Sequence, residues 1–297
     1  MIENEQILKR FRSLAVWNNG GQRAPHKPLL CLLAISKMLN GYERLLPFSM
    51  IEKTLCELLI SFGPPRKVCH PEYPFWSLKN EKGKIWEFRS TPPIRLESDA
   101  LPTRAALLRN QAEGGFQAEV FHAIKHDDEL RSQIITSLLD SHFPETMHED
   151  ILQSLNLRTG KESAKTKERD PQFRDKILSA YEYRCAVCGF NVRLGHVVIA
   201  LEAAHIKWHQ AGGPDIHENG LALCSLHHKL FDRGAFTVDT DHRALISERA
   251  YGTDGFIEHL GRYHKKPLIK PNRESYRPKG DFLSWHMHQV FLSPVRE

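Results

Sequence analysis

The sequence predicts an α+β protein in two parts: a mainly helical N-terminal domain with a small sheet, and a C-terminal domain of short strands and helices built around paired metal ligands. Three observations predict it. Segments with apolar residues at helical spacing fill most of the first 157 residues. A polar, charged stretch, RTGKESAKTKERDP, follows and is typical of a linker. Two pairs of Cys and His residues come after it. We therefore expect domains over 1–157 and 171–297, joined by a linker over 158–170.

The composition excludes several classes of protein. The first residues, MIENEQILKRFRSL, carry no apolar core of a signal peptide, and no apolar run approaches the roughly 18 residues that span a bilayer. Two of the six cysteines stand in a C-x-x-C motif, which favours a reduced protein with a metal site over a disulfide framework. The net charge is +5, and most of it lies beyond residue 158. We expect a cytoplasmic protein with a mild preference for anionic partners and without a membrane partner.

The N-terminal elements follow from their apolar patterns. We expect helices over NEQILKRFRSLAVW, over KPLLCLLAISKMLNG, with Pro28 in its first turn and Gly41 beyond its end, and over SMIEKTLCELLISFG, with Ser49 as N-cap. GKIWEFRS alternates and predicts a short strand. FHAIKHDDELRSQIITSLLDSHFP and HEDILQSLNL predict further helices.

In the C-terminal half, DPQFRDKILSAYEYRC predicts a helix that leads into Cys185, and GHVVIALEAAHI is rich in β-formers and ends near His205. NGLALCSLHHKLFDRGAF is expected to begin as a loop and continue as a helix. Residues 241–297 are rich in basic and His residues. Two interpretations of them stay open: an extension of a DNA-binding surface, or packing on the domain core.

Four residues are candidate metal ligands: Cys185, Cys188, Cys224 and His227. Two C-x-x-C/H pairs supply soft and borderline ligands, which suit a closed tetrahedral structural Zn²⁺. The alternative is four ordinary buried residues, but this paired spacing rarely arises by coincidence.

Three more residues of the C-terminal half stand at a characteristic spacing. His205 lies 14 residues before Asn219, and His228 lies nine residues after Asn219. Together with CAVC, LEAAHI, NGLALC and LHHKLFDRG, they resemble the HNH, or ββα-metal, nuclease motif over roughly residues 170 to 240. His227 and His228 are neighbours on the predicted helix, about 100° apart, so one can face the zinc and the other a catalytic ion.

The resemblance implies an endonuclease that hydrolyses phosphodiester bonds with one Mg²⁺ or Mn²⁺. It makes His205 the general base and His228 a ligand of the catalytic ion. Asn219 then orients His205 through the backbone. Many relatives have Asp directly before the first histidine, where this chain has Ala204, so Glu202 is the candidate second ligand. Asp232, in the motif's F-D-x-G tail, is expected to be a structural hydrogen-bonding residue.

The N-terminal half holds two stretches suited to phosphate. His26 and Lys27 precede a helix, whose free N–H groups favour anions, and HPEYPFWSL mixes aromatic residues with prolines. APHKPLL, GPPRK and HPEYPFWSL resemble the sulfur-binding domain of bacterial phosphorothioate-dependent restriction endonucleases, which join it to a C-terminal HNH domain. The resemblance implies a shallow apolar pocket for a sulfur that replaces a non-bridging phosphate oxygen. The residues that it assigns to DNA and sulfur binding are Tyr73, Pro74 and Ser77 in the pocket wall, His26 and Lys27 closing it, and Arg23 and Arg66 as phosphate or base contacts.

Together, the two resemblances imply a type IV-like restriction endonuclease of bacterial defence, which acts at the nucleoid, binds double-stranded, phosphorothioate-modified DNA and cuts nearby. An apolar pocket favours sulfur because a phosphate oxygen there would lose its hydration without compensation. One nuclease site per chain favours a homodimer for cutting both strands. Two alternatives stay open: an HNH nuclease directed to methylated or otherwise modified bases, and a DNA-binding regulator with an inert HNH scaffold.

Overall fold

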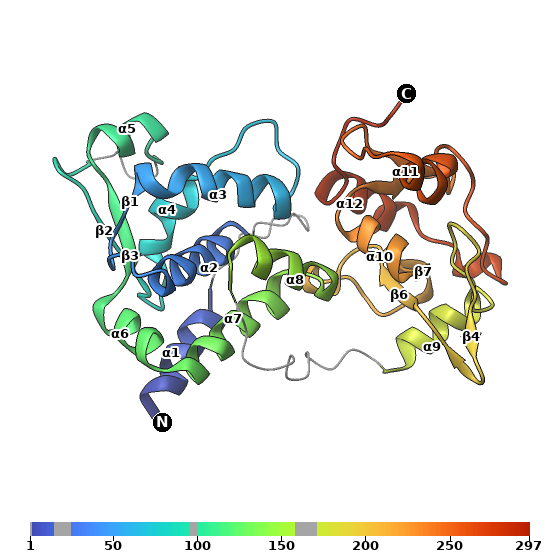
Figure 1. Ribbon diagram of the computed structural model, residues 1–297, viewed down its shortest axis with the longest axis horizontal. Helices are drawn as coiled ribbons and strands as arrows, with labels where there is room; N and C mark the ends of the chain where they lie inside the picture. The colour runs from blue at the N-terminus through green and yellow to red at the C-terminus, as the bar shows by residue number, and fades with distance from the viewer. Residues whose placement is uncertain (1, 15–24, 95–99, 158–170) are drawn as a thin grey trace. The chain divides into compact units, whose positions relative to one another are not determined.

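A computed structural model describes residues 2–14, 25–94, 100–157 and 171–297 (Figure 1). The described residues form two compact units, one within the first 157 residues and one from residue 171 onward. Both units mix helices with small antiparallel sheets, so the predicted α+β class is confirmed. None of the described helices is long and apolar enough to cross a membrane.

The N-terminal unit is mainly helical. Its helices are α1 (Ile2–Arg12), α2 (His26–Leu39), α3 (Phe48–Phe62), α4 (Glu72–Ser77), α5 (Arg104–Arg109), α6 (Ala118–His126), α7 (Asp128–His142) and α8 (Glu145–Ser154), with a short 3₁₀ helix η1 (Leu78–Asn80) after α4. Strands β1 (Leu46–Pro47), β3 (Glu113–Phe116) and β2 (Trp86–Arg89) form an antiparallel sheet in that order. In Figure 1, α2 runs through the middle of this unit, where it packs against α3, α4, α6 and α7.

Helix α2 forms the buried centre of this unit because its sequence is a nearly continuous apolar run. Nearly all of its side chains from Pro28 to Met38 are buried. Gly41 follows the helix with a φ of +80°, a backbone conformation that glycine adopts without steric cost. One prediction at a helix end was wrong. Helix α3 begins at Phe48 after Pro47, so Ser49 lies inside its first turn and does not cap it.

Residues 121–144, which were expected to be helical, are divided between two helices. They form the end of α6 and all of α7, because Asp127 leaves the helical conformation between them. Its side chain accepts a hydrogen bond of 2.8 Å from the backbone N–H of Leu130. A carboxylate at this position satisfies an N–H that has no partner within the helix, and so it starts a new helix.

The C-terminal unit is built around a hairpin. Its helices are α9 (Pro171–Ala180), α10 (Ser225–Asp232), α11 (Asp254–His259) and α12 (Gly280–Gln289), and its strands are β4 (Arg193–Leu194), β5 (Val197–Val198), β6 (Leu201–His205), β7 (Gly220–Cys224), β8 (Phe236–Val238) and β9 (Ala244–Ile246). Strands β6 and β7 pair antiparallel, with His205 opposite Gly220 and Leu201 opposite Cys224. Helix α9 packs on both strands, and α10 follows β7 directly. NGLALC, expected to begin as a loop, is mostly strand, because all five residues of β7 are buried and pair with β6.

Residues 241–297 belong to the core of this unit. Leu260, Leu268 and Leu283 lie in the same apolar cluster as β6 and β7. Buried His286 contacts the Thr237 hydroxyl at 2.8 Å through Nδ1 and the Phe231 carbonyl oxygen at 3.2 Å through Nε2. The segment therefore packs on the core, and this packing leaves open whether its exposed side chains extend a DNA-binding surface.

Candidate functional site

The four candidate zinc ligands come together in the C-terminal unit. The sulfur and nitrogen atoms of Cys185, Cys188, Cys224 and His227 all lie within 4.8 Å of one another. Cys188 Sγ lies 3.9 Å from Cys224 Sγ, and two thiolates on one tetrahedral zinc are about 3.8 Å apart. The donor set and its spacing therefore fit a zinc ion.

The His227 ring is oriented for a metal ligand. Its Nε2 donates a hydrogen bond to the backbone carbonyl oxygen of His259 at 2.9 Å, while its Nδ1 lies 3.1 Å from Cys224 Sγ and 3.8 Å from Cys185 Sγ. The bond to His259 holds the proton on Nε2, so the lone pair of Nδ1 points at the three sulfurs. Hydrogen bonds with Cys188 and Cys224 lower the pKa of Cys185, and the contacts of Cys224 with Cys185 and Cys188 raise the pKa of Cys224, so the three thiols share their protons as one group.

His228, the next residue on α10, faces a different set of groups. Its Nδ1 lies 2.6 Å from Glu202 Oε2 on β6, and its Nε2 lies 3.2 Å from Asp232 Oδ2, one turn later on α10. Burial disfavours the charged ring, but the Asp232 and Glu202 carboxylates outweigh it and raise the pKa of His228 to about 9. The hydrogen bond with His228 in turn lowers the pKa of Glu202. The two carboxylates suit a hard divalent ion such as Mg²⁺ or Mn²⁺, and an ion that also bound His228 would displace the proton that these carboxylates favour on its ring.

His205 stands at the end of β6 with its ring held from two sides. It stacks on Phe173 of α9, with ring centroids 4.0 Å apart, and its Nε2 lies 2.7 Å from Asp215 Oδ1. Sequence reasoning missed Asp215, which lies in the loop between the paired strands. The only signal for it was a carboxylate in the short span between His205 and Asn219.

Asn219 fixes that loop from a fully buried position. Its Oδ1 accepts the backbone N–H of Lys207 at 2.8 Å, and its Nδ2 donates to the carbonyl oxygens of Lys207 and Pro214, both at 3.0 Å. The amide thus ties the chain just after His205 to the residue before Asp215. This is the kind of backbone contact through which Asn219 was predicted to act.

The predicted sulfur-pocket residues lie on two neighbouring elements of the N-terminal unit. His26 and Lys27 open α2, while Tyr73, Pro74 and Ser77 lie on α4, and these two helices pack against each other. Tyr73 is exposed, Ser77 is half-buried and Pro74 is buried. The Lys27 ammonium pairs with Glu81, a buried carboxylate that the sequence analysis did not single out.

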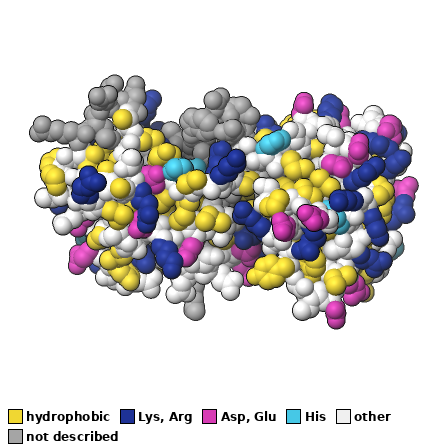
Figure 2. All heavy atoms as spheres, turned by 90° about the horizontal axis from the view of Figure 1, so that it is seen from above, with side chains coloured by type: hydrophobic (Ala, Val, Ile, Leu, Met, Phe, Trp, Pro, Cys, Tyr) yellow, Lys and Arg dark blue, Asp and Glu magenta, His cyan; other side chains and the backbone are white. Residues whose placement is uncertain are grey.

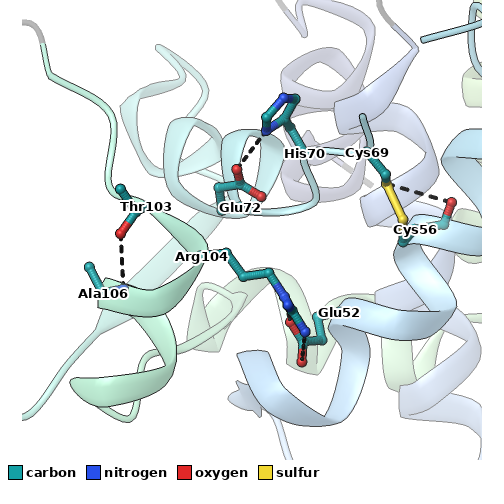
Figure 3. A network of polar contacts seen from close by, with 8 residues as sticks. All are labelled: Glu52, Cys56, Cys69, His70, Glu72, Thr103, Arg104 and Ala106. Carbon is teal, nitrogen blue, oxygen red and sulfur yellow. Dashed lines mark hydrogen bonds and ion pairs between the residues drawn. A yellow bond between two sulfur atoms is a disulfide. The ribbon is translucent and has the colours of Figure 1, made fainter. Parts of the chain in front are cut away.

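The segment before α4 is fixed by several contacts (Figure 3). The His70 ring stacks on Tyr73 at 4.5 Å, and its Nδ1 lies 2.8 Å from Oε1 of buried Glu72. Cys69 is joined to Cys56 of α3 by a disulfide across a Cα–Cα distance of 5.9 Å. The expectation of a reduced protein was wrong for this pair, because the fold brings two residues 13 apart to bonding distance.

Two further residues were predicted to contact DNA. Arg66 is exposed on the loop between α3 and α4. Arg23 lies outside the described residues.

Comparison with protein families decides the class of the chain. The model of the ScoMcrA-like, DNA sulfur-binding domain family matches residues 4–160. The chain belongs to this family. An HNH endonuclease model matches residues 185–239, so this member of the sulfur-binding family also carries an HNH endonuclease domain and is a DNA endonuclease by class. Both resemblances drawn from the sequence are confirmed.

Solved structures add further likenesses. The sulfur-binding domain of SprMcrA, complexed with phosphorothioated DNA, is 19% identical with a TM-score of 0.44, over 52% of this chain and 94% of that one. The sulfur-binding domain of ScoMcrA, likewise in complex, is 22% identical with a TM-score of 0.43, over 50% and 96%. The modification-dependent restriction endonuclease TagI is 22% identical with a TM-score of 0.29, over 45% and 41%. No curated protein was found to match, and the assignment rests on the family models.

Proposed function

We propose that the protein is a phosphorothioate-dependent restriction endonuclease, with a sulfur-binding domain over 1–157, a linker over 158–170 and a nuclease domain over 171–297. One observation carries the proposal: a match to the DNA sulfur-binding family and a match to HNH endonucleases lie on the same chain. A reader of modified DNA joined to a nuclease is the organisation of a modification-dependent restriction enzyme. Its partner is double-stranded DNA in the bacterial cytoplasm, and a homodimer would cut both strands.

The N-terminal domain recognises the modification. Tyr73, Pro74 and Ser77 of α4 form the wall of the sulfur pocket, and His26 and Lys27 of α2 close it. Sulfur is larger and less strongly hydrated than oxygen. An apolar wall therefore favours a phosphorothioate over an unmodified phosphate, because the phosphate oxygen would lose more hydration there. The Glu81 carboxylate holds Lys27, which then presents one directed positive charge to the phosphate. Arg66 and Arg23 contact phosphates or bases nearby.

The C-terminal domain hydrolyses the backbone. With the proton on Nε2 and donated to Asp215, Nδ1 of His205 is the basic nitrogen, and it takes a proton from the attacking water. Phe173 and Asp215 keep the ring in position, and Asn219 holds the loop that carries Asp215. His228 and Glu202 would hold Mg²⁺ or Mn²⁺, which stabilises the charge on the leaving oxygen when it is bound.

Two other groups have structural roles in this proposal. The cluster of Cys185, Cys188, Cys224 and His227 binds Zn²⁺ and fixes the start of α10. Asp232, which is 1% exposed, orients His228 from within the same helix.

The test uses one duplex in two forms, with and without a single phosphorothioate, incubated with the protein and Mg²⁺ or Mn²⁺. We expect cleavage of the sulfur-bearing duplex alone, and His205→Ala should abolish cleavage while retaining selective binding. Equal cleavage of both duplexes would contradict the sulfur pocket and favour a reader of modified bases. Selective binding without cleavage by the wild type would contradict the nuclease half of the proposal.

A further inference from the structure

A segment of the C-terminal unit that the proposed mechanism does not use holds an unusual concentration of charge. Residues Arg262–Lys279, the basic strap, contain seven Lys and Arg and one Glu. The rest of the chain contains 34 Lys and Arg against 35 Asp and Glu. The whole of the net charge of +5 therefore originates in these 18 residues, and the remainder of the protein is nearly neutral.

The charges of the basic strap face solvent. Six of its seven basic residues are exposed, namely Arg262, Lys265, Lys266, Lys270, Arg273 and Lys279. Its single acid, Glu274, pairs with half-buried Arg277 at 2.9 Å. Within the described residues, Lys265, Lys266 and Lys270 form no ion pair. Figure 2 shows Lys and Arg side chains, in dark blue, gathered at one end of the C-terminal unit.

The backbone of the basic strap is fixed on the nuclease core. The N–H of Ile269 donates to the carbonyl oxygen of Ala186, between the metal-cluster cysteines, at 2.8 Å. The N–H of Asn272 donates to Ala180 at the end of α9 at 2.7 Å. Because its backbone is held at these points, the strap keeps its Lys and Arg residues on the surface of the nuclease core, unlike a solvated tail.

The other end of the basic strap reaches the catalytic loop. The N–H of Lys279 donates to the carbonyl oxygen of Glu218 at 3.1 Å, and its ammonium lies 3.2 Å from the Glu218 carboxylate. Glu218 directly precedes Asn219. Tyr276 stacks on His217 with ring centroids 3.8 Å apart. The strap therefore runs from the metal cluster to the loop that holds the catalytic residues.

We infer that the basic strap is a phosphate-contacting surface by which the nuclease domain grips the DNA backbone beside its active site. The inference rests on the proposed function, since it takes DNA as the polyanion. Lysine ammonium groups neutralise phosphates without reading bases, so the strap adds affinity and position but no sequence preference. Such a contact keeps the duplex at the HNH site while the N-terminal domain selects the modification.

The test is the salt dependence of binding by the full chain, measured without added divalent ion on the duplex with and without phosphorothioate. In a triple variant, Lys265→Gln, Lys266→Gln and Lys270→Gln, each lost phosphate contact should reduce the slope of log K against log salt by about 0.9, or about 2.7 in all. The control carries Lys9→Gln, Lys125→Gln and Arg249→Gln, which removes the same charge from exposed positions outside the strap.

Three results together support the strap. The triple variant loses the same amount of slope on both duplexes, and the ratio of its affinities for the two duplexes stays at the wild-type value. The control variant keeps the wild-type slope. A wild-type slope in the triple variant, or an equal loss in the control, overturns it. A wild type that binds both duplexes equally would contradict the sulfur pocket instead, and a loss of slope in the triple variant would still support the strap. The experiment therefore distinguishes a failure of the basic strap from a failure of the sulfur pocket.

Discussion

Asp215 offers the sharpest test of the nuclease mechanism, because its contribution depends on one contact. Its carboxylate lies 2.7 Å from Nε2 of His205, and the two side chains are 20% and 10% exposed. A hydrogen bond to a charged group is worth about 1.5–3 kcal/mol in a folded protein. Since each 1.36 kcal/mol changes a rate tenfold, Asp215→Ala should slow cleavage by roughly 10- to 150-fold. The residual rate should exceed that of His205→Ala, because stacking on Phe173 still holds the ring.

The assay is single-turnover cleavage of the phosphorothioated duplex at saturating protein, with DNA affinity measured in parallel. Asp215 acts through His205, so the cleavage rate should fall while the affinity stays at the wild-type value. Asp215→Asn retains an oxygen that accepts the Nε2 proton and should recover part of the rate. Asp241→Ala removes an exposed carboxylate of the same unit and should leave the rate unchanged. A rate for Asp215→Ala within twofold of the wild type, in a protein with unchanged thermal unfolding, would refute the role of Asp215.

Three further predictions concern other parts of the chain. Cys224→Ala should remove the bound zinc, measured by release to a chromogenic chelator, and should increase amide hydrogen exchange in the C-terminal unit. Retained zinc would contradict the assignment of the cluster as a zinc site. Tyr73→Ala should reduce the preference for phosphorothioated over unmodified duplex by about tenfold or more, measured by competition binding. An equal loss of affinity for both duplexes would instead mean that Tyr73 contacts DNA without regard to sulfur. Burial lowers the pKa of His142 from 6.5 to about 4. The unfolded chain then binds this proton more readily, so the contribution of His142 to the free energy of unfolding should be constant above pH 6.5 and fall by at most about 3 kcal/mol toward pH 4 in urea titrations. His142→Gln should flatten this profile, and an unchanged profile would exclude His142.

The sequence was sufficient where the chemistry lies in short, regular spacings. A C-x-x-C and a C-x-x-H pair are local patterns, and the four ligand atoms of Cys185, Cys188, Cys224 and His227 do meet in space. The apolar run of α2 is similarly local, and it forms the buried centre of its unit. Helix boundaries were less certain, as Ser49 illustrates, because Pro47 and Phe48 already begin α3.

Pairings between distant residues could not be predicted in this way. The contact of Lys27 with Glu81 joins residues 54 positions apart, and it exists because η1 follows α4 beside the start of α2. The Cys56–Cys69 disulfide depends on the turn of the chain between α3 and α4. Nor does the local sequence distinguish Asp215 from an ordinary loop acid. Tertiary packing decides each of these contacts, and periodicity carries no information about it.

The geometry of α10 explains why two adjacent histidines can serve two sites. Cys224 ends β7 and stands directly before α10, so the metal cluster defines where the helix starts. His227 then faces the cluster, and the rotation of about 100° per residue turns His228 toward Glu202 on the paired strand. The position of His228 therefore depends on the cluster that its neighbour completes. A structural zinc that touches no substrate would on this account still control catalysis, because it sets the orientation of the helix that carries the ligand of the catalytic ion.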